Sequence, residues 1–127
     1  MLPLRYARAW LVTGILVLGI GLFSALTPVP SGMPSFNDKL VHAAGFMAFT
    51  LWFGGIFTPR SMPKVALALA AYGLLIELLQ GLTRTRQPEA LDLVADIAGI
   101  LLGWLLSAAG LSRWCTTLES WLAPRNP

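Results

Sequence analysis

The sequence predicts an all-α polytopic membrane protein with four transmembrane helices and a short C-terminal amphipathic helix in the membrane interface. The 127 residues are 56% hydrophobic and only 12% charged, and the mean hydropathy is +0.69. A soluble domain of this size has too little interior to hide so much hydrocarbon. Four long apolar runs separated by short proline-containing loops then give the helix count. We expect one domain over residues 1–127.

The first predicted transmembrane helix covers residues 9–26. Arg5 and Arg8 precede eighteen residues without a charge, a length of about 27 Å as a helix, close to the hydrocarbon thickness of a bilayer. A basic start followed by an apolar run also describes a signal peptide. Leu26 is followed by Thr27 and Pro28 rather than by a small-residue cleavage site, so a retained helix is the favoured interpretation.

The second and third predicted helices cover residues 38–57 and 65–82. Asp38 suits a helix start, where a carboxylate caps the chain and meets the positive dipole end, and Lys39 suits a membrane anchor. His42 lies one turn further, on the same face as Asp38, so the pair is either structural or functional. Glu77 and Gln80 share one face of the third helix, and Arg84 extends this face if the helix continues.

The fourth predicted helix covers residues 91–111, and the interfacial helix covers 112–122. Asp92 and Asp96 lie one turn apart, and Gly99 and Gly103 continue their face as a G-x-x-x-G pattern, which favours close helix packing. In the tail, apolar residues recur at helical spacing, and Trp114 and Trp121 are expected to anchor at headgroup level.

Lysine and arginine residues predict the orientation. In a four-helix chain, one side carries Arg5, Arg8, Arg60, Lys64, Arg113 and Arg125, and the other carries Lys39, Arg84 and Arg86. Six against three places both termini in the cytoplasm.

Composition excludes several classes of function. The net charge of +3 is dispersed rather than gathered into a basic stripe, so no nucleic-acid partner is expected. No glycine-rich phosphate loop and no C-x-x-C pair occur. Cys115 is the only cysteine, which excludes an internal disulfide and a thiolate zinc site.

Polar residues from distant parts of the chain are predicted to share one depth. Counted from the expected helix ends, His42, Glu77 and Asp96 each lie about 6 to 8 Å inside. An unpaired charge at that depth costs several kcal/mol, so these groups should face one another, pair with Lys39, Arg84 or Arg86, and enclose an outward-facing polar pocket.

These residues carry a family resemblance. Asp38-Lys39-x-x-His42-x-x-x-Phe46, then Glu77-x-x-Gln80, then Arg86 with Asp92, then Asp96-x-x-Gly99-x-x-x-Gly103 resembles the VanZ-like family of small bacterial membrane proteins, over about half the chain. Phe46 stands where many relatives have Tyr, and Asp96 where many have Asn. The resemblance implies a multi-pass bacterial inner-membrane protein of the cell envelope. The founding relative is linked to low-level resistance to the glycopeptide teicoplanin, and no established reaction comes with the resemblance.

Two classes of function follow, with a purely structural or assembly role as a third. In the first, the pocket binds an anionic membrane lipid or a lipid-linked cell-wall precursor. The expected ligand-binding residues are Asp38, Lys39, His42, Glu77, Gln80, Arg84, Arg86, Asp92 and Asp96. In the second, the protein is an intramembrane hydrolase or transferase acting on a lipid headgroup.

For such an enzyme the candidate catalytic residues are His42, with Asp38 orienting it, Glu77 and Asp92. No metal or other cofactor is implied by the sequence. If a metal is present, its candidate ligands are His42, Glu77, Asp92 and Asp96.

Overall fold

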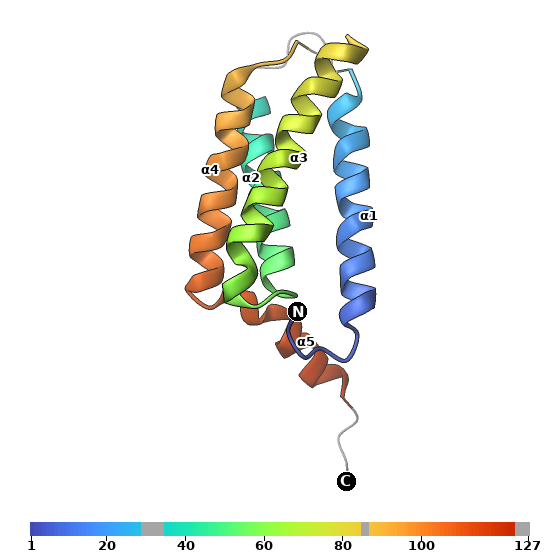
Figure 1. Ribbon diagram of the computed structural model, residues 1–127, viewed down its shortest axis with the longest axis vertical. Coiled ribbons are helices and arrows are strands. Elements are labelled where there is room, and N and C mark those ends of the chain that lie inside the picture. Colours follow the sequence, from blue (N-terminus) through green and yellow to red (C-terminus); the bar gives the residue numbers. More distant parts are fainter. Residues whose placement is uncertain (29–34, 85–86, 124–127) are drawn as a thin grey trace.

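A computed structural model describes residues 1–28, 35–84 and 87–123, and this part of the chain is helical without strands. Consecutive helices from α1 to α4 run in opposite directions, so α1 is parallel to α3 and α2 is parallel to α4 (Figure 1). Helix α5 lies across the end of the bundle at which α1 begins. The helices are α1 Ala7–Leu26, α2 Ser35–Gly54, α3 Met62–Thr83, α4 Ala90–Ala108 and α5 Trp114–Leu122, with 3₁₀ turns η1 Pro59–Ser61 and η2 Leu111–Arg113.

Each predicted run coincides with a helix, but several boundaries differ. Helix α2 begins and ends three residues earlier than 38–57, so Asp38 lies in its first turn rather than capping it. Helix α4 ends at Ala108 rather than at 111 because Gly110 adopts a φ of 115°, a left-handed conformation that glycine accepts most readily. Helix α3 ends at Thr83, and Arg84 has a φ of 53°. Arg84 therefore does not extend the face of Glu77 and Gln80.

Helices α2 and α4 form the closest pair in the bundle. A Cβ atom on Gly99 would meet the backbone carbonyl oxygen of Ala43, and one on Gly103 would lie 2.8 Å from the carbonyl oxygen of Met47. These contacts leave room only for a hydrogen at either position. The G-x-x-x-G pattern therefore is a packing face, as predicted.

Helix α1 is joined to α3 by two hydrogen bonds and packs against α2. The Tyr72 hydroxyl donates to the Leu18 carbonyl at 2.6 Å, and the Gln80 amide donates to the Ala25 carbonyl at 2.8 Å. Gly14 lies against Trp52, where a Cβ would approach the indole nitrogen to 2.8 Å.

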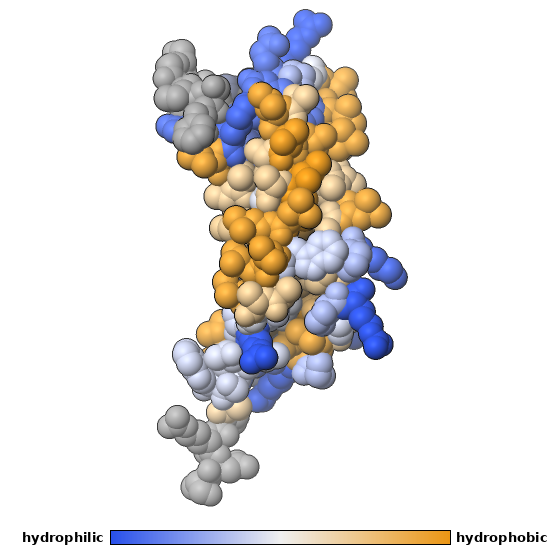
Figure 2. All heavy atoms as spheres, turned by 90° about the vertical axis from the view of Figure 1, so that its left-hand side faces the viewer, coloured by the Kyte–Doolittle hydropathy of each residue, from blue (hydrophilic) through white to orange (hydrophobic). Residues whose placement is uncertain are grey.

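The surface of the bundle is apolar around its middle. Figure 2 shows hydrophobic residues between two zones of hydrophilic ones. By length and composition, three helical segments can span a membrane: Ala7–Leu26, Pro59–Thr83 and Ala90–Ala108. Helix α2 has the same length as α1, but Asn37, Asp38, Lys39 and His42 make its first two turns polar.

At the α5 end, one carboxylate joins both ends of the chain. Glu119 of α5 accepts hydrogen bonds from the backbone N–H groups of Arg5 and Tyr6 at 2.7 and 2.9 Å, and from the indole of Trp10 at 2.8 Å. Burial opposes ionisation of Glu119, but these three donors outweigh it and lower the pKa. Glu119 thus satisfies donors just before α1.

Trp114 contacts other parts of the bundle, whereas Trp121 does not share these contacts. The indole N–H of Trp114 donates to the Leu51 carbonyl at 3.0 Å, and its ring lies 4.9 Å from that of Trp52 and 5.4 Å from that of Trp10. Trp114 therefore packs inward against these two rings, and the Leu51 carbonyl that it reaches also accepts the backbone N–H of Gly55 at 3.1 Å. Trp121 is 77% exposed. Cys115 is fully buried, and burial raises the pKa of its thiol to about 11.

Candidate functional site

The candidate site lies at the end of the bundle where α2 and α4 begin and α3 ends, opposite α5 (Figure 1). Three helices contribute buried ionisable side chains here. The exposed fractions are 7% for His42 of α2, 8% for Glu77 of α3, and 2% and 0% for Asp92 and Asp96 of α4. The predicted shared polar layer is therefore present among the described residues. We refer to Asp38, Lys39, His42, Glu77, Glu89, Asp92 and Asp96 as the polar cluster.

His42 is positioned by Asp96 rather than by Asp38. Its Nδ1 atom lies 2.8 Å from Asp96 Oδ1, so one ring nitrogen is engaged in a hydrogen bond between α2 and α4. Its Nε2 atom faces Asp92 Oδ2 at 3.9 Å, beyond hydrogen-bond distance. We predicted that Asp38 orients the imidazole, but the hydrogen bond is with Asp96, because the close α2–α4 contact brings Asp96 directly against the ring.

Asp92 pairs with Lys39. The Lys39 ammonium lies 3.0 Å from Asp92 Oδ1 and 2.7 Å from Glu89 Oε2. Asp92 is a buried member of the cluster rather than a rim residue. Arg86 lies outside the described residues, so its predicted contacts are not described. Arg84 is exposed and forms no ion pair with a described carboxylate.

Glu77 and Gln80 share a face of α3 but have different partners. Glu77 Oε2 accepts the backbone N–H of Glu89 at 3.0 Å and so receives a donor at the start of α4. Gln80 turns to the last turn of α1 through Ala25. One oxygen on each side chain, Glu77 Oε1 and Gln80 Oε1, is buried without a hydrogen-bond partner in the described part of the chain.

Asp96 also has one unsatisfied oxygen. Its Oδ2 atom is buried without a hydrogen-bond partner and points at Gly73 of α3, where a Cβ would lie 2.7 Å away. Gly73 therefore provides the space in which Asp96 can hold its position against His42.

A cavity of about 180 Å³ opens beside the polar cluster between α1, α2 and α3. Asp38 and His42 line its polar end. The remaining lining is mostly apolar or small: Gly21, Ser24, Ala25, Val41, Gly45, Phe46, Phe49, Tyr72 and Ile76. Its walls are thus amphipathic, with charge at one end and hydrocarbon along the rest.

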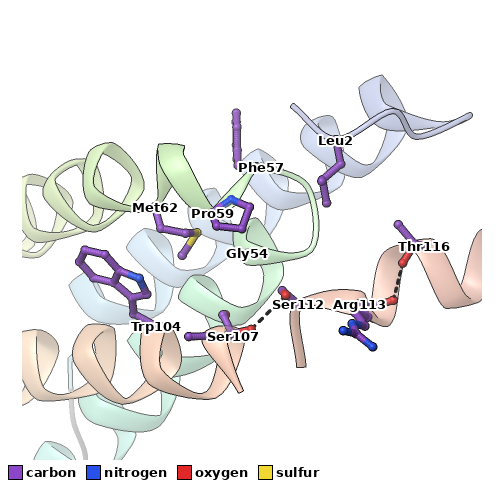
Figure 3. Close-up of a pocket in the computed structure, with 11 residues that line it drawn as sticks. Leu2, Gly54, Phe57, Pro59, Met62, Trp104, Ser107, Ser112, Arg113 and Thr116 are labelled. Atoms are coloured by element: carbon purple, nitrogen blue, oxygen red, sulfur yellow. Dashed lines mark hydrogen bonds between the residues drawn. The ribbon is translucent and has the colours of Figure 1, made fainter. Parts of the chain in front are cut away.

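A second cavity, of about 200 Å³, lies at the α5 end (Figure 3). Met62, Trp104 and Phe57 make its wall largely apolar, and Arg113 is its only ionisable lining residue. None of the predicted site residues lies there. The polar cluster is therefore next to the cavity between α1, α2 and α3 and not next to this second one.

The described part of the polar cluster is rich in negative charge. Five carboxylates, those of Asp38, Glu77, Glu89, Asp92 and Asp96, face one lysine and one histidine. Asp38, His42 and Asp92 each offer a ligand atom, and these atoms lie within 4.8 Å of one another. This wall attracts cations more strongly than anions.

Two features of the site escaped the sequence reasoning. Glu89 lies three residues before Asp92 and shares its partner Lys39, and its position just before the fourth predicted helix is equally typical of a helix-start charge. Tyr72 lines the cavity from α3, and its only sequence signal is that it is the single aromatic residue of the run 65–82. Neither residue can be assigned to the site until the helix packed beside it is known.

Comparisons of the chain with protein-family models, curated proteins and solved structures find no match.

Proposed function

We propose that the protein is a four-span membrane protein of the bacterial cell envelope that binds a lipid or lipid-linked headgroup at the polar cluster. The observation that carries this proposal is the continuity between a buried ionisable cluster and an apolar cavity beside it. A ligand with a polar head and a hydrocarbon tail matches both parts. Neither a purely polar nor a purely apolar ligand does.

The packing of α2 supports the fourth span. Ala43 of α2 lies against Gly99, and Gly54 lies against Ser107, so α2 follows α4 along its length. Since α4 is apolar and long enough to cross a bilayer, α2 crosses with it. The lysine and arginine count then places both termini in the cytoplasm and the polar cluster at the outer face.

The headgroup is expected to be anionic, as in phospholipids and lipid-linked precursors. Lys39 and Arg84 are described cations near the ends of α2 and α3 at this face. The acidic wall around Asp92 does not attract a bare phosphate, so a positive charge must lie between the wall and the headgroup. The resemblance of segment 38–103 to VanZ-like proteins agrees with an envelope role linked to glycopeptide susceptibility.

A second candidate function is supported by the geometry of His42. A histidine held through Nδ1 by a buried aspartate, with Nε2 directed elsewhere, is the arrangement of a general base. In this reading the protein is an intramembrane hydrolase or transferase, and Asp96 takes the orienting role expected of Asp38. Turnover of a headgroup by wild type but not by His42→Gln distinguishes this candidate.

Lipid retention tests the proposed function. The protein is extracted with its native lipids, and the lipids that co-purify are identified by mass spectrometry. We expect one lipid class at a fixed ratio to protein, reduced roughly tenfold or more in Lys39→Gln, since losing a charged contact costs about 1.5 to 3 kcal/mol. Lys64→Gln, an exposed lysine at the opposite end, is the matched control.

The proposal fails if wild type carries the bulk membrane lipid mixture. It also fails if Lys39→Gln and Lys64→Gln, at equal thermal stability, retain the same lipid to the same extent.

A further inference from the structure

We propose that Asp38, His42 and Asp92 bind one divalent transition-metal cation, with Zn²⁺ as the class representative. The three residues come from two helices, and each offers a ligand atom within 4.8 Å of the other two. An ion with ligand bonds of about 2.0 to 2.2 Å spans atoms up to roughly 4 Å apart. Small side-chain rotations therefore close this set around one ion.

The orientation of His42 fits metal binding. Metal-binding histidines commonly donate one ring N–H to a carboxylate, which fixes the tautomer and leaves the other nitrogen for the ion. Asp96 takes that N–H from Nδ1 at 2.8 Å, and Nε2 faces Asp92 Oδ2 at 3.9 Å. That separation is too long for a hydrogen bond and close to the spacing of two ligands on one ion.

Asp92 is arranged to serve two partners at once. Its Oδ1 atom is taken by Lys39 at 3.0 Å, while Oδ2 points toward the imidazole. One oxygen thus remains for an ion.

Two buried carboxyl oxygens of the polar cluster have no hydrogen-bond partner among the described residues. They are Glu77 Oε1 and Asp96 Oδ2, and Glu77 interacts electrostatically with His42, Asp92 and Asp96. Buried carboxylate oxygens without partners are costly. Among the described residues, Lys39 and His42 are the basic groups beside Asp92 and Asp96, and a divalent cation next to Asp92 adds positive charge to this acidic wall.

The ligand types restrict the metal. One imidazole and two carboxylates suit Zn²⁺ or Mn²⁺ better than Ca²⁺ or Mg²⁺, which prefer oxygen ligands alone. Three protein ligands also leave a position for an exogenous ligand, as in zinc sites that bind substrate.

Asp38 and His42 line the amphipathic cavity, so an ion between them can be reached from it. The cation would then take a phosphate oxygen of the headgroup and supply the positive charge that the acidic wall requires. This bridging role rests on the proposed function, whereas the ion site rests on the geometry alone.

Zinc titration tests the ion site. The full chain, purified in detergent with an affinity tag free of histidine and stripped with a chelator, is titrated with ZnCl₂ by calorimetry. We expect one equivalent to bind, and Asp38→Asn and His42→Gln each to weaken binding at least tenfold. Asp96→Asn, which changes only the partner of Nδ1, should weaken it by about 10- to 100-fold. Glu89→Gln, a carboxylate of the same cluster outside the ligand set, should change it by less than about threefold.

Far-UV circular dichroism and melting temperature confirm that each variant is folded. The inference is overturned if wild type binds no zinc, if the ligand variants bind as wild type does, or if Glu89→Gln loses as much as Asp38→Asn. Lipid retention is then measured with and without zinc. Zinc binding without a retained lipid would contradict the proposed function and leave the ion site intact, and lipid retention that ignores zinc would contradict only the bridging role.

Discussion

The two ends of the bundle both use buried or half-buried acidic groups, but they satisfy them differently. At the α5 end, Glu119 accepts three hydrogen bonds from donors near the start of α1, next to packed indole rings. At the other end, Asp96 and Glu77 each leave one buried oxygen without a partner. The carboxylate of Glu119 has its hydrogen bonds satisfied within the fold. Asp96 and Glu77 each keep one oxygen that can still contact a ligand.

If the carboxylates of the polar cluster are not satisfied within the fold, helix packing must hold this end of the bundle together. Gly99→Leu tests this and should have the largest effect, because any side chain at this position meets the backbone of Ala43. We expect a loss of about 1 to 3 kcal/mol or more, up to failure to fold. Gly19→Ala is the control, since a Cβ there has no atom within 4 Å. Thermal melting in detergent compares the two, and equal stability would mean that helix packing is not what fixes the polar cluster.

The acid dependence of stability should distinguish Glu119. Its folded pKa lies below the ordinary value of 4.5, so ionised Glu119 stabilises the fold above that value, and the contribution is lost as pH falls through the folded pKa. We expect wild type to melt higher than Glu119→Gln near neutral pH and the difference to shrink in acid. A difference that stays constant with pH would show that the carboxylate charge is not what joins α5 to α1.

The smallest expected effect concerns the indoles of α5. Trp114→Phe removes the hydrogen bond to Leu51 and should lower stability by about 1 kcal/mol. Trp121→Phe should leave the melting temperature unchanged, because Trp121 is 77% exposed. Equal effects of the two changes would contradict the inward packing of Trp114.

Much of the helical architecture follows from the sequence because apolar length and helical period are local properties. The same periodicity placed His42, Glu77 and Asp96 at one depth, and it found the packing face of Gly99 and Gly103. It could not give the rotation of each helix about its axis. For this reason Asp96 rather than Asp38 engages His42, and Gln80 faces α1 rather than the cluster.

Other differences depend on chain reversals and long-range partners. The left-handed residue Gly110 follows the end of α4 at Ala108, three residues before the end that the apolar pattern predicts. The inward contacts of Trp114 could not be predicted from the sequence around it, because its partners lie more than sixty residues away, on α1 and α2. Such contacts are properties of the assembled bundle.

Paired measurement of stability and bound lipid in Asp92→Asn and Glu119→Gln tests the central claim most directly. Asp92 is buried and paired with Lys39, so neutralising it lowers the stability of the fold, although Asn keeps an acceptor for Lys39. Asp92→Asn should therefore lose retained lipid beyond its loss of folded protein. Glu119→Gln should melt lower and retain lipid in proportion to folded protein. Lipid retention by Asp92→Asn in proportion to folded protein, or lipid loss by Glu119→Gln beyond its loss of folded protein, would contradict the assignment of binding to the polar cluster.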